Sequence, residues 1–417
     1  MSKIRLLQTG DWHIDVSPSK APRHEDHQHF LCWLLQLMKE EQTDVFLHTG
    51  NIFNKAIPSN KGLNLLSDFV FQASELPDLK AMVFICGNHD LSHFLESLNP
   101  LLKTARDIKI HFISSLPVEQ EQIYQKLLVP VTCPSSGAHL ATIIAFPYTP
   151  HSILLAKYTS DKKSAIDRFS DLEQSLKDIY TSLAKQAQSK FAQGPLIAMG
   201  HFNCADQETL KTAFSSHRSI YFNQKFTPEL FCDSYDYIAL GHNHNHLSLN
   251  DGRIQYAGSP ITTSDEECTT RHVLQIEIDE SNTAQVKPIQ VPPFRKTVVF
   301  DGSLTELLDL LEQEDVVQTT YLYATVTQTN SHQDVLKHLE KHSAHVRLID
   351  LKQPQEKSFL DQAPPLSMLD PEQIFSEIYT QKYNSLPSEE LTDLLKQAVH
   401  KALYQEELNS KISETVD

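Results

Sequence analysis

The chain is poor in cysteine, lacks long apolar runs and has no excess of basic side chains, and each shortage excludes a class of protein. Its six cysteines form no Cys-x-x-Cys pair and several lie in apolar runs, so we expect reduced cysteines in a core. No apolar stretch approaches the roughly 20 residues of a transmembrane helix. The first strand pattern begins within a few residues of Met1, which leaves no room for a signal peptide. We therefore expect a cytoplasmic protein without membrane attachment.

The shortage of basic residues bears on the partners of the chain. Acidic residues number 53 and basic residues 36, which gives a net charge of −17. Proteins that bind nucleic acid through charge usually carry a basic face, so this balance argues against broad, salt-driven DNA binding by the chain alone. The 417 residues, of which 40% are hydrophobic, predict two or three domains with substantial cores.

Five short apolar runs share one design: each stops near a glycine, and residues that can bind metals follow at once. Continuous apolar runs of this length predict strands that are buried on both faces. Glycine lets the backbone turn sharply beyond the strand end. The runs lead into Thr9-Gly10-Asp11-Trp12-His13, Thr49-Gly50-Asn51, Gly87-Asn88-His89-Asp90, Gly200-His201 and Gly241-His242-Asn243-His244.

These strand ends predict a shared site. Functional side chains of sheet proteins with helices on both faces collect at the edge where the strands end. Each residue taken singly is an ordinary turn or surface residue, but their recurrence at five strand ends predicts a binuclear metal centre. The candidate ligands are Asp11, His13, Asn51, Asn88, His201, His242 and His244.

The order of the motifs resembles that of the calcineurin-like metallophosphoesterases. The chain matches Asp-x-His, Gly-Asn-His-Asp, Gly-His and Gly-His-x-His, and it departs from the family only where Gly50-Asn51 replaces Gly-Asp. The start Asp11-Trp12-His13, the segment Tyr256-Ala257-Gly258-Ser259-Pro260 and the chain length are more narrowly similar to the nuclease subunits of SbcCD-type complexes. The resemblance is strong over residues 1–265 and looser beyond them.

The resemblance implies an α/β fold in which a calcineurin-like β-sandwich is flanked by helices and holds two divalent ions. Donors without thiolate suit Mn²⁺. The implied chemistry is in-line hydrolysis of a phosphodiester. His89 would contact the scissile phosphate or protonate the leaving oxygen, and Asp90 would orient a ligand imidazole. The implied ligand sets are Asp11, His13 and His244 for one ion, Asn88, His201 and His242 for the other, and Asn51 as the bridge.

Asn51 weakens the case for a second ion. Two divalent ions about 4 Å apart repel by on the order of 15 kcal/mol at an effective dielectric constant near 20, and a neutral amide offsets less of this than aspartate does. We expect weak binding of the second ion, unless Asp15 supplies a carboxylate instead of lying in a surface turn. Asn51 is a designed inactivating substitution, a natural loss of activity, or a variant that works with one firmly held ion. Asn54, also at an expected aspartate, favours natural divergence.

Beyond the predicted nuclease domain, residues 1–265, the pattern changes. A strand–helix–strand–helix–strand pattern that begins at Thr297 predicts a small α/β capping domain, which we place at residues 266–352. A linker, residues 353–369, leads to a predicted pair of amphipathic helices in residues 370–410. The resemblance implies that this acidic pair binds an SMC-like ATPase of the SbcC type. Alternatively, the pair folds back on its own domain.

Predicted helices near Asn64–Ala73 and Phe94–Ala105 concern the oligomeric state. The resemblance implies that helices in this region join two copies into a homodimer within a heterotetramer, although their apolar residues could equally be core. The function that follows is a metal-dependent exonuclease and endonuclease subunit that processes ends and hairpins of duplex DNA. The alternatives are a catalytically silent scaffold subunit of the same complex, which Asn51 favours, and a small-molecule phosphodiesterase.

Overall fold

The structure is a computed structural model, and the chain divides into two compact units. The first comprises residues 1–150, 173–207 and 225–355, and the second residues 151–172, 208–224 and 356–417. Nearly all described residues belong to the first unit. None of the helices among the described residues is long and apolar enough to cross a membrane. The structure describes residues 3–17, 23–99, 108–117, 120–150, 153–154, 165–191, 193–205, 226–263, 270–312, 320–327, 346–352, 379, 387–388 and 391–394.

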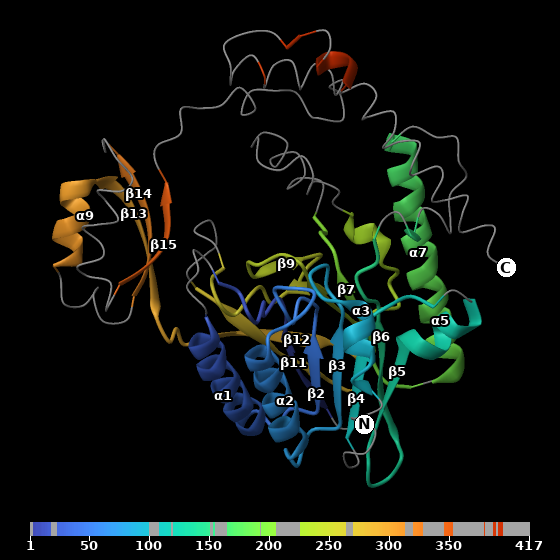
Figure 1. Cartoon of the computed structure of the whole chain (residues 1–417). Coiled ribbons are helices and arrows are strands. Elements are labelled where there is room, and N and C mark those ends of the chain that lie inside the picture. Colours follow the sequence, from blue (N-terminus) through green and yellow to red (C-terminus); the bar gives the residue numbers. More distant parts are fainter. Residues whose placement is uncertain are drawn as a thin grey trace. The chain divides into compact units, whose positions relative to one another are not determined.

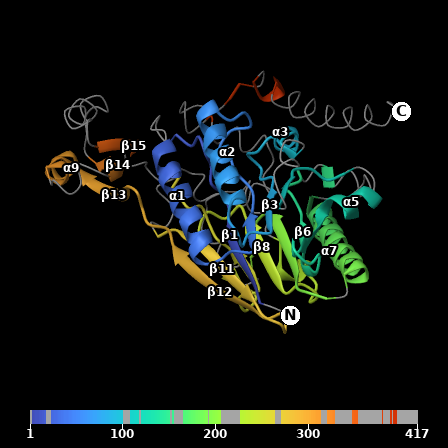
Figure 2. The same cartoon turned by 90° about the horizontal axis from the view of Figure 1, so that it is seen from below.

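A first mixed sheet of six strands runs in the order β12-β11-β1-β2-β3-β4. Its middle strands are parallel, and β11 joins β1 in the antiparallel direction. Two helices, α1 (His24–Glu40) and α2 (Asn60–Ser74), connect β1 to β2 and β2 to β3 and lie side by side (Figures 1 and 2). The strands are β1 (Ile4–Thr9), β2 (Val45–His48), β3 (Ala81–Ile85), β4 (Lys109–Ile113), β11 (His272–Ile278) and β12 (Ala284–Gln290).

A second mixed sheet of six strands runs in the order β5-β6-β7-β8-β10-β9. Helix α7 (Ala165–Lys190) packs on this sheet: the buried hydroxyl of Tyr180 in α7 donates to the carbonyl of Met199 in β7 at 3.0 Å. Short helices α3 (Ser92–Glu96) and α5 (Gln120–Leu127) precede β4 and β5. The two sheets with their helices confirm the predicted α/β fold. The strands are β5 (Leu128–Thr132), β6 (His139–Ala145), β7 (Leu196–His201), β8 (Tyr237–Gly241), β9 (Leu247–Leu249) and β10 (Ile254–Tyr256).

Trp12 anchors the core beneath the first sheet's strand ends. It is fully buried, its ring meets Phe69 edge-on at 5.2 Å, and its indole N–H donates to Thr9 Oγ1 at 3.0 Å. Because Trp12 is fixed in the core, the polar side chains of Asp11 and His13 on either side of it are held at the sheet edge.

The candidate dimer residues mostly belong to this same core. Leu66, Phe69, Val70 and Leu95 are buried in it, and Leu65 and Leu98 pack against it. The first predicted helix is α2, whereas α3 ends at Glu96 and the rest of the second predicted helix runs into residues outside the described ranges. The core explanation therefore accounts for these side chains.

The predicted boundary after residue 265 is wrong in one respect. Strands β11 and β12 pair with β1 and with each other, so residues 272–290 complete the first sheet instead of opening the cap. The free cysteines also differ in part from expectation: Cys86 and Cys204 are buried, but Cys32 is exposed on α1 and Cys133 and Cys232 are half-buried.

A small sheet of three parallel strands follows, in the order β13-β14-β15. Between the first two lies α9 (Leu304–Leu311), which begins at a capping box formed by Ser303 and Glu306. The three predicted strands and the first predicted helix are confirmed, while the second helix of the predicted pattern, placed at residues 333–341, lies outside the described residues. Within the predicted pair of helices, residues 370–410, Ser388 Oγ accepts from the amide of Leu391 at 3.3 Å and residues 391–394 are helical; most of this segment lies outside the described ranges. The strands are β13 (Lys296–Ser303), β14 (Thr320–Thr327) and β15 (Val346–Lys352).

Candidate metal centre

The strand ends meet as predicted, and backbone strain marks the meeting point. Asp11, His13, Asn51 and His242 all have positive φ, from 47° to 93°. Such left-handed conformations cost non-glycine residues about 1–3 kcal/mol each and persist only where the surroundings hold them. Here the amide of Asp11 donates to Gly50 O at 2.8 Å, and that of His13 to Asn51 O at 3.0 Å. The loop after β1 is thus tied to the loop after β2.

Asp11, His13 and His244 form a group that fits a divalent cation. Their ligand atoms all lie within 4.8 Å of one another. His13 Nε2 is 3.1 Å from His244 Nε2, and each of these nitrogens is 3.9 Å from Asp11 Oδ1. Burial holds the pKa of His13 well below its usual value, so its imidazole stays neutral and keeps a lone pair for a metal. One carboxylate and two imidazoles suit Mn²⁺ or a similar ion.

The other expected ligands lie beside this group. His201 Nδ1 is 2.7 Å from the carbonyl oxygen of Thr49, which can only accept, so the ring proton is on Nδ1. Its Nε2 is therefore a bare acceptor, and it lies 3.0 Å from another acceptor, Asn88 Oδ1. The ring of His242 is 5.2 Å from that of His201. The structure thus brings together all seven candidate ligands, and their roles in binding ions stay predictions.

Two carboxylates differ from expectation. Asp90 orients no imidazole: its oxygens accept from the amides of Ile52, Phe53 and Gly87 at 3.2, 2.9 and 2.9 Å. It holds two ligand loops together through their backbones. Asp15 is buried, so it does not lie in a surface turn. It also stands outside the ligand group of Asp11, His13 and His244.

Asp15 serves the fold instead. Its oxygens accept from the amide of Ser59 at 2.7 Å and the hydroxyl of Ser59 at 2.5 Å, and lie 2.6 Å from His24 Nε2. Because Ser59 caps α2, Asp15 joins the first ligand loop to that helix. Its carboxylate is fully used there and cannot compensate for Asn51.

Several residues that orient the ligands were not predicted. Asn54 Oδ1 lies 3.2 Å from His13 Nδ1 and fixes the proton there. His244 is held twice: its carbonyl accepts from Ser259 N at 3.0 Å and Arg271 Nη1 at 2.8 Å, and its Nδ1 is 3.3 Å from Thr263 Oγ1. The segment Tyr256-Ala257-Gly258-Ser259-Pro260, noted for its resemblance, was the one signal available in the sequence.

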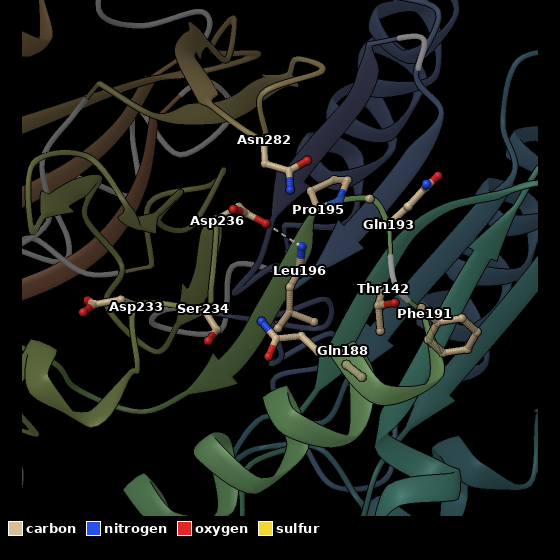
Figure 3. A pocket seen from close by; sticks show the side chains of 12 residues that line it. Thr142, Gln188, Phe191, Gln193, Pro195, Leu196, Asp233, Ser234, Asp236 and Asn282 are labelled. Carbon is tan, nitrogen blue, oxygen red and sulfur yellow. Dashed lines mark hydrogen bonds between the residues drawn. The ribbon is translucent and has the colours of Figure 1, made fainter.

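A cavity of about 360 Å³ lies at the opposite end of the second sheet, where β7 begins (Figure 3). Its wall includes Gln188, Asn282 and Asp236, and a carboxylate oxygen of Asp236 accepts from the amide of Leu196 at 2.7 Å. The ligands lie beyond the other end of β7, so this cavity is separate from the metal centre.

Comparison with known proteins agrees with the geometry. Residues 4–246 match the family model of the calcineurin-like phosphoesterases. The chain belongs to this family. Residues 293–383 match a second model, described as the type 5 capsule protein repressor C-terminal domain.

Two relatives are named as the D component of the nuclease SbcCD. The protein of Rhodobacter capsulatus is 25% identical over 316 residues, which cover 74% of this chain and 76% of that protein. The protein of Escherichia coli K12 is 26% identical over 324 residues, which cover 76% of this chain and 75% of that protein. The similarity therefore extends beyond the phosphoesterase domain.

We expect the affinity for the first ion to fall below about pH 6. Burial raises the pKa of Asp11 to about 6, although nearby His244 and the His242 amide lower it in part. Metal binds the carboxylate, so affinity is full above this pKa and falls by up to about tenfold per pH unit below it. Mn²⁺ titrations between about pH 5 and pH 8 test this. Circular dichroism serves as the control for folding, and an affinity that stays constant down to pH 5 would contradict the expectation.

We also expect Thr263→Val to weaken binding of the first ion by about tenfold or more. A neutral His244 that binds through Nε2 has its proton on Nδ1, and this Nδ1–H then donates a hydrogen bond to Thr263 Oγ1. Mn²⁺ affinity measured by electron paramagnetic resonance tests this. Thr263→Ser should restore it, and Thr283→Val, at the exposed β11–β12 turn, should leave it unchanged. Equal affinity in Thr263→Val and the unmodified protein would mean that Thr263 does not position His244.

Proposed function

We propose that the protein is the metal-dependent nuclease subunit of an SbcCD-type complex and hydrolyses phosphodiester bonds at the ends and hairpins of duplex DNA. The observation that carries this proposal is the convergence of Asp11, His13 and His244 beside His89, whose ring lies 4.9 Å from that of His13. Relatives named as the D component of this nuclease, matched over three-quarters of the chain, support the substrate class.

The contacts of His89 support a role at the phosphate. Its Nδ1 lies 3.3 Å from the carbonyl oxygen of Asn54, so the ring donates there and leaves Nε2 free. Its backbone amide donates to Asn51 Oδ1 at 3.0 Å. The side chain is exposed, whereas neighbouring His13 and Asn51 are buried. In its protonated form His89 can donate from Nε2 to a phosphate oxygen or to the departing oxygen.

Divalent ions, Mn²⁺ in this proposal, would supply charge stabilisation of the phosphoryl transition state when bound. Asp11, His13 and His244 would hold the first ion, and Asn88, His201 and His242 provide donors for a second. The protein's own contribution is to keep these donors neutral or anionic and correctly oriented. Asn54 and Thr263 do so through the ring nitrogens that face away from the ions.

The partners are part of the same proposal. A protein of this type would work as a homodimer with an SMC-like ATPase of the SbcC type, in the cytoplasm, and act on duplex DNA. Residues 365–417 contain ten acidic and four basic residues, which suits a protein partner better than DNA. The charge of −17 likewise favours a complex in which the partner contributes much of the DNA binding.

One observation favours a second candidate, a catalytically silent scaffold subunit of the same complex. Asn51 leaves Asp11 as the only anionic side chain among the candidate ligands. A scaffold would keep the fold and the partner surface without cleaving DNA.

A nuclease assay on linear duplex DNA with Mn²⁺ separates these candidates. We expect cleavage by the unmodified protein. In His89→Gln the cleavage rate should fall by about 100-fold or more, because general acid catalysis contributes on this order. Metal content should stay nearly unchanged, since His89 is assigned to the phosphate. His93→Gln, an exposed histidine on α3, is the matched control. No cleavage by the unmodified protein with its ATPase partner present would favour the scaffold, and loss of metal in His89→Gln would overturn the role of His89.

A further inference from the structure

The side-chain amide of Asn51 is fixed in one orientation. The backbone amide of His89 can only donate, so the atom that faces it at 3.0 Å is Asn51 Oδ1. Nδ2 must then face the opposite way, where it donates to Asp11 Oδ1 at 3.0 Å and to Asn88 Oδ1 at 3.2 Å. Asn51 is 1% exposed. All three hydrogen bonds require the same orientation of the amide, because exchanging Oδ1 and Nδ2 by a 180° rotation would break each of them.

This orientation conflicts with the bridging role expected at position 51. An amide nitrogen directs hydrogens, not a free lone pair, at its neighbours, and both hydrogens of Asn51 Nδ2 point at oxygens that would face the ions. To bind an ion through Oδ1, Asn51 would have to rotate. The amide of His89 would then lose its acceptor, and the two hydrogen bonds that Nδ2 donates would break, each at a cost in free energy.

We propose that Asn51 takes the place of a cation in this centre. Its two N–H groups donate to Asp11 Oδ1 and Asn88 Oδ1, as a cation between these two oxygens would attract them. The ligands are thereby held in place without a metal ion. The position of the second ion is closed by Nδ2. A carboxylate at position 51 would instead bring an oxygen within about 3 Å of the buried Asp11 carboxylate, a repulsion that bound cations would offset.

Thermal unfolding in a metal chelator at about pH 8 tests this. We expect Asn51→Asp to lower the Tm by roughly 5 °C relative to the unmodified protein. Mn²⁺ should raise the Tm of this variant by more than it raises that of the unmodified protein. Asn64→Asp makes the same chemical change at an exposed position of α2 and should have no such effect. Asn51→Leu, which removes the donors without adding charge, should lower the Tm in chelator and gain no extra stabilisation from Mn²⁺.

Metal content gives the second readout. We expect one tightly held Mn²⁺ in the unmodified protein and two in Asn51→Asp. Recovery of folded Asn51→Asp only in the presence of Mn²⁺ would support the proposal. Three results would each overturn it: a Tm of Asn51→Asp in chelator equal to that of the unmodified protein, two tightly held ions in the unmodified protein, or an Asn51→Asp chain that stays unfolded with Mn²⁺. The inference concerns the metal centre of the proposed nuclease, but the comparison in chelator requires neither bound metal nor cleavage, so the two can fail separately.

Discussion

The metal centre depends on holding two sheets that share no strand in one alignment, and the buried side chain of Gln8 sets that alignment. Gln8 lies in β1, three residues before Asp11. Its Nε2 donates to Gln255 O at 3.0 Å and contacts Leu240 O at 3.4 Å, and its Oε1 accepts from the hydroxyl of Tyr237. These partners all belong to the second sheet. Apolar burial between the sheets contributes more free energy but has no direction. A slip of one residue would leave the buried amide unpaired, at about 1–3 kcal/mol per group.

Once the sheets are aligned, buried Asp11 and half-buried Asp90 hold the loops that carry the ligands. Asp11 joins the sheets at the site, since its second oxygen accepts from the amide of His242 at 2.9 Å. The carboxylate of Asp90 accepts hydrogen bonds from backbone amides of the loops after β2 and β3. The sequence contains acidic residues near the ligands, and Asp11 is the one whose carboxylate lies in the group with His13 and His244.

The sequence reveals the strand ends well because that pattern is local. An apolar run, a glycine and a donor side chain lie within a few residues, and the structure brings together all seven ligands predicted in this way. The pairing of β11 with β1 joins residues about 270 positions apart in the chain, and no local pattern encodes it, so the predicted boundary after residue 265 cut through the sheet.

The supporting residues were missed for a related reason. Asp15 and Asp90 stand beside predicted ligands in the sequence, yet their carboxylates meet the amides of other loops. Thr263 and Arg271 are distant from His244 along the chain and reach it only through the fold. Spacing therefore predicts which side chains reach the sheet edge, whereas tertiary packing decides which of them face the ions.

Asn51 connects the metal centre to the residue proposed to act on the substrate. A carboxylate has two oxygens, one of which could accept from the His89 amide while the other faced the ions. An amide has a single oxygen, and in Asn51 this oxygen faces the His89 amide while Nδ2 faces Asp11 and Asn88. In this chain, a second ion bridged by Asn51 and a fixed His89 therefore exclude each other. The arrangement that keeps the three hydrogen bonds of Asn51 would have one ion at Asp11, His13 and His244, with His89 held against Asn51. Phosphodiester cleavage by this protein would then rely on proton donation from His89 to an extent that a two-ion centre would not require.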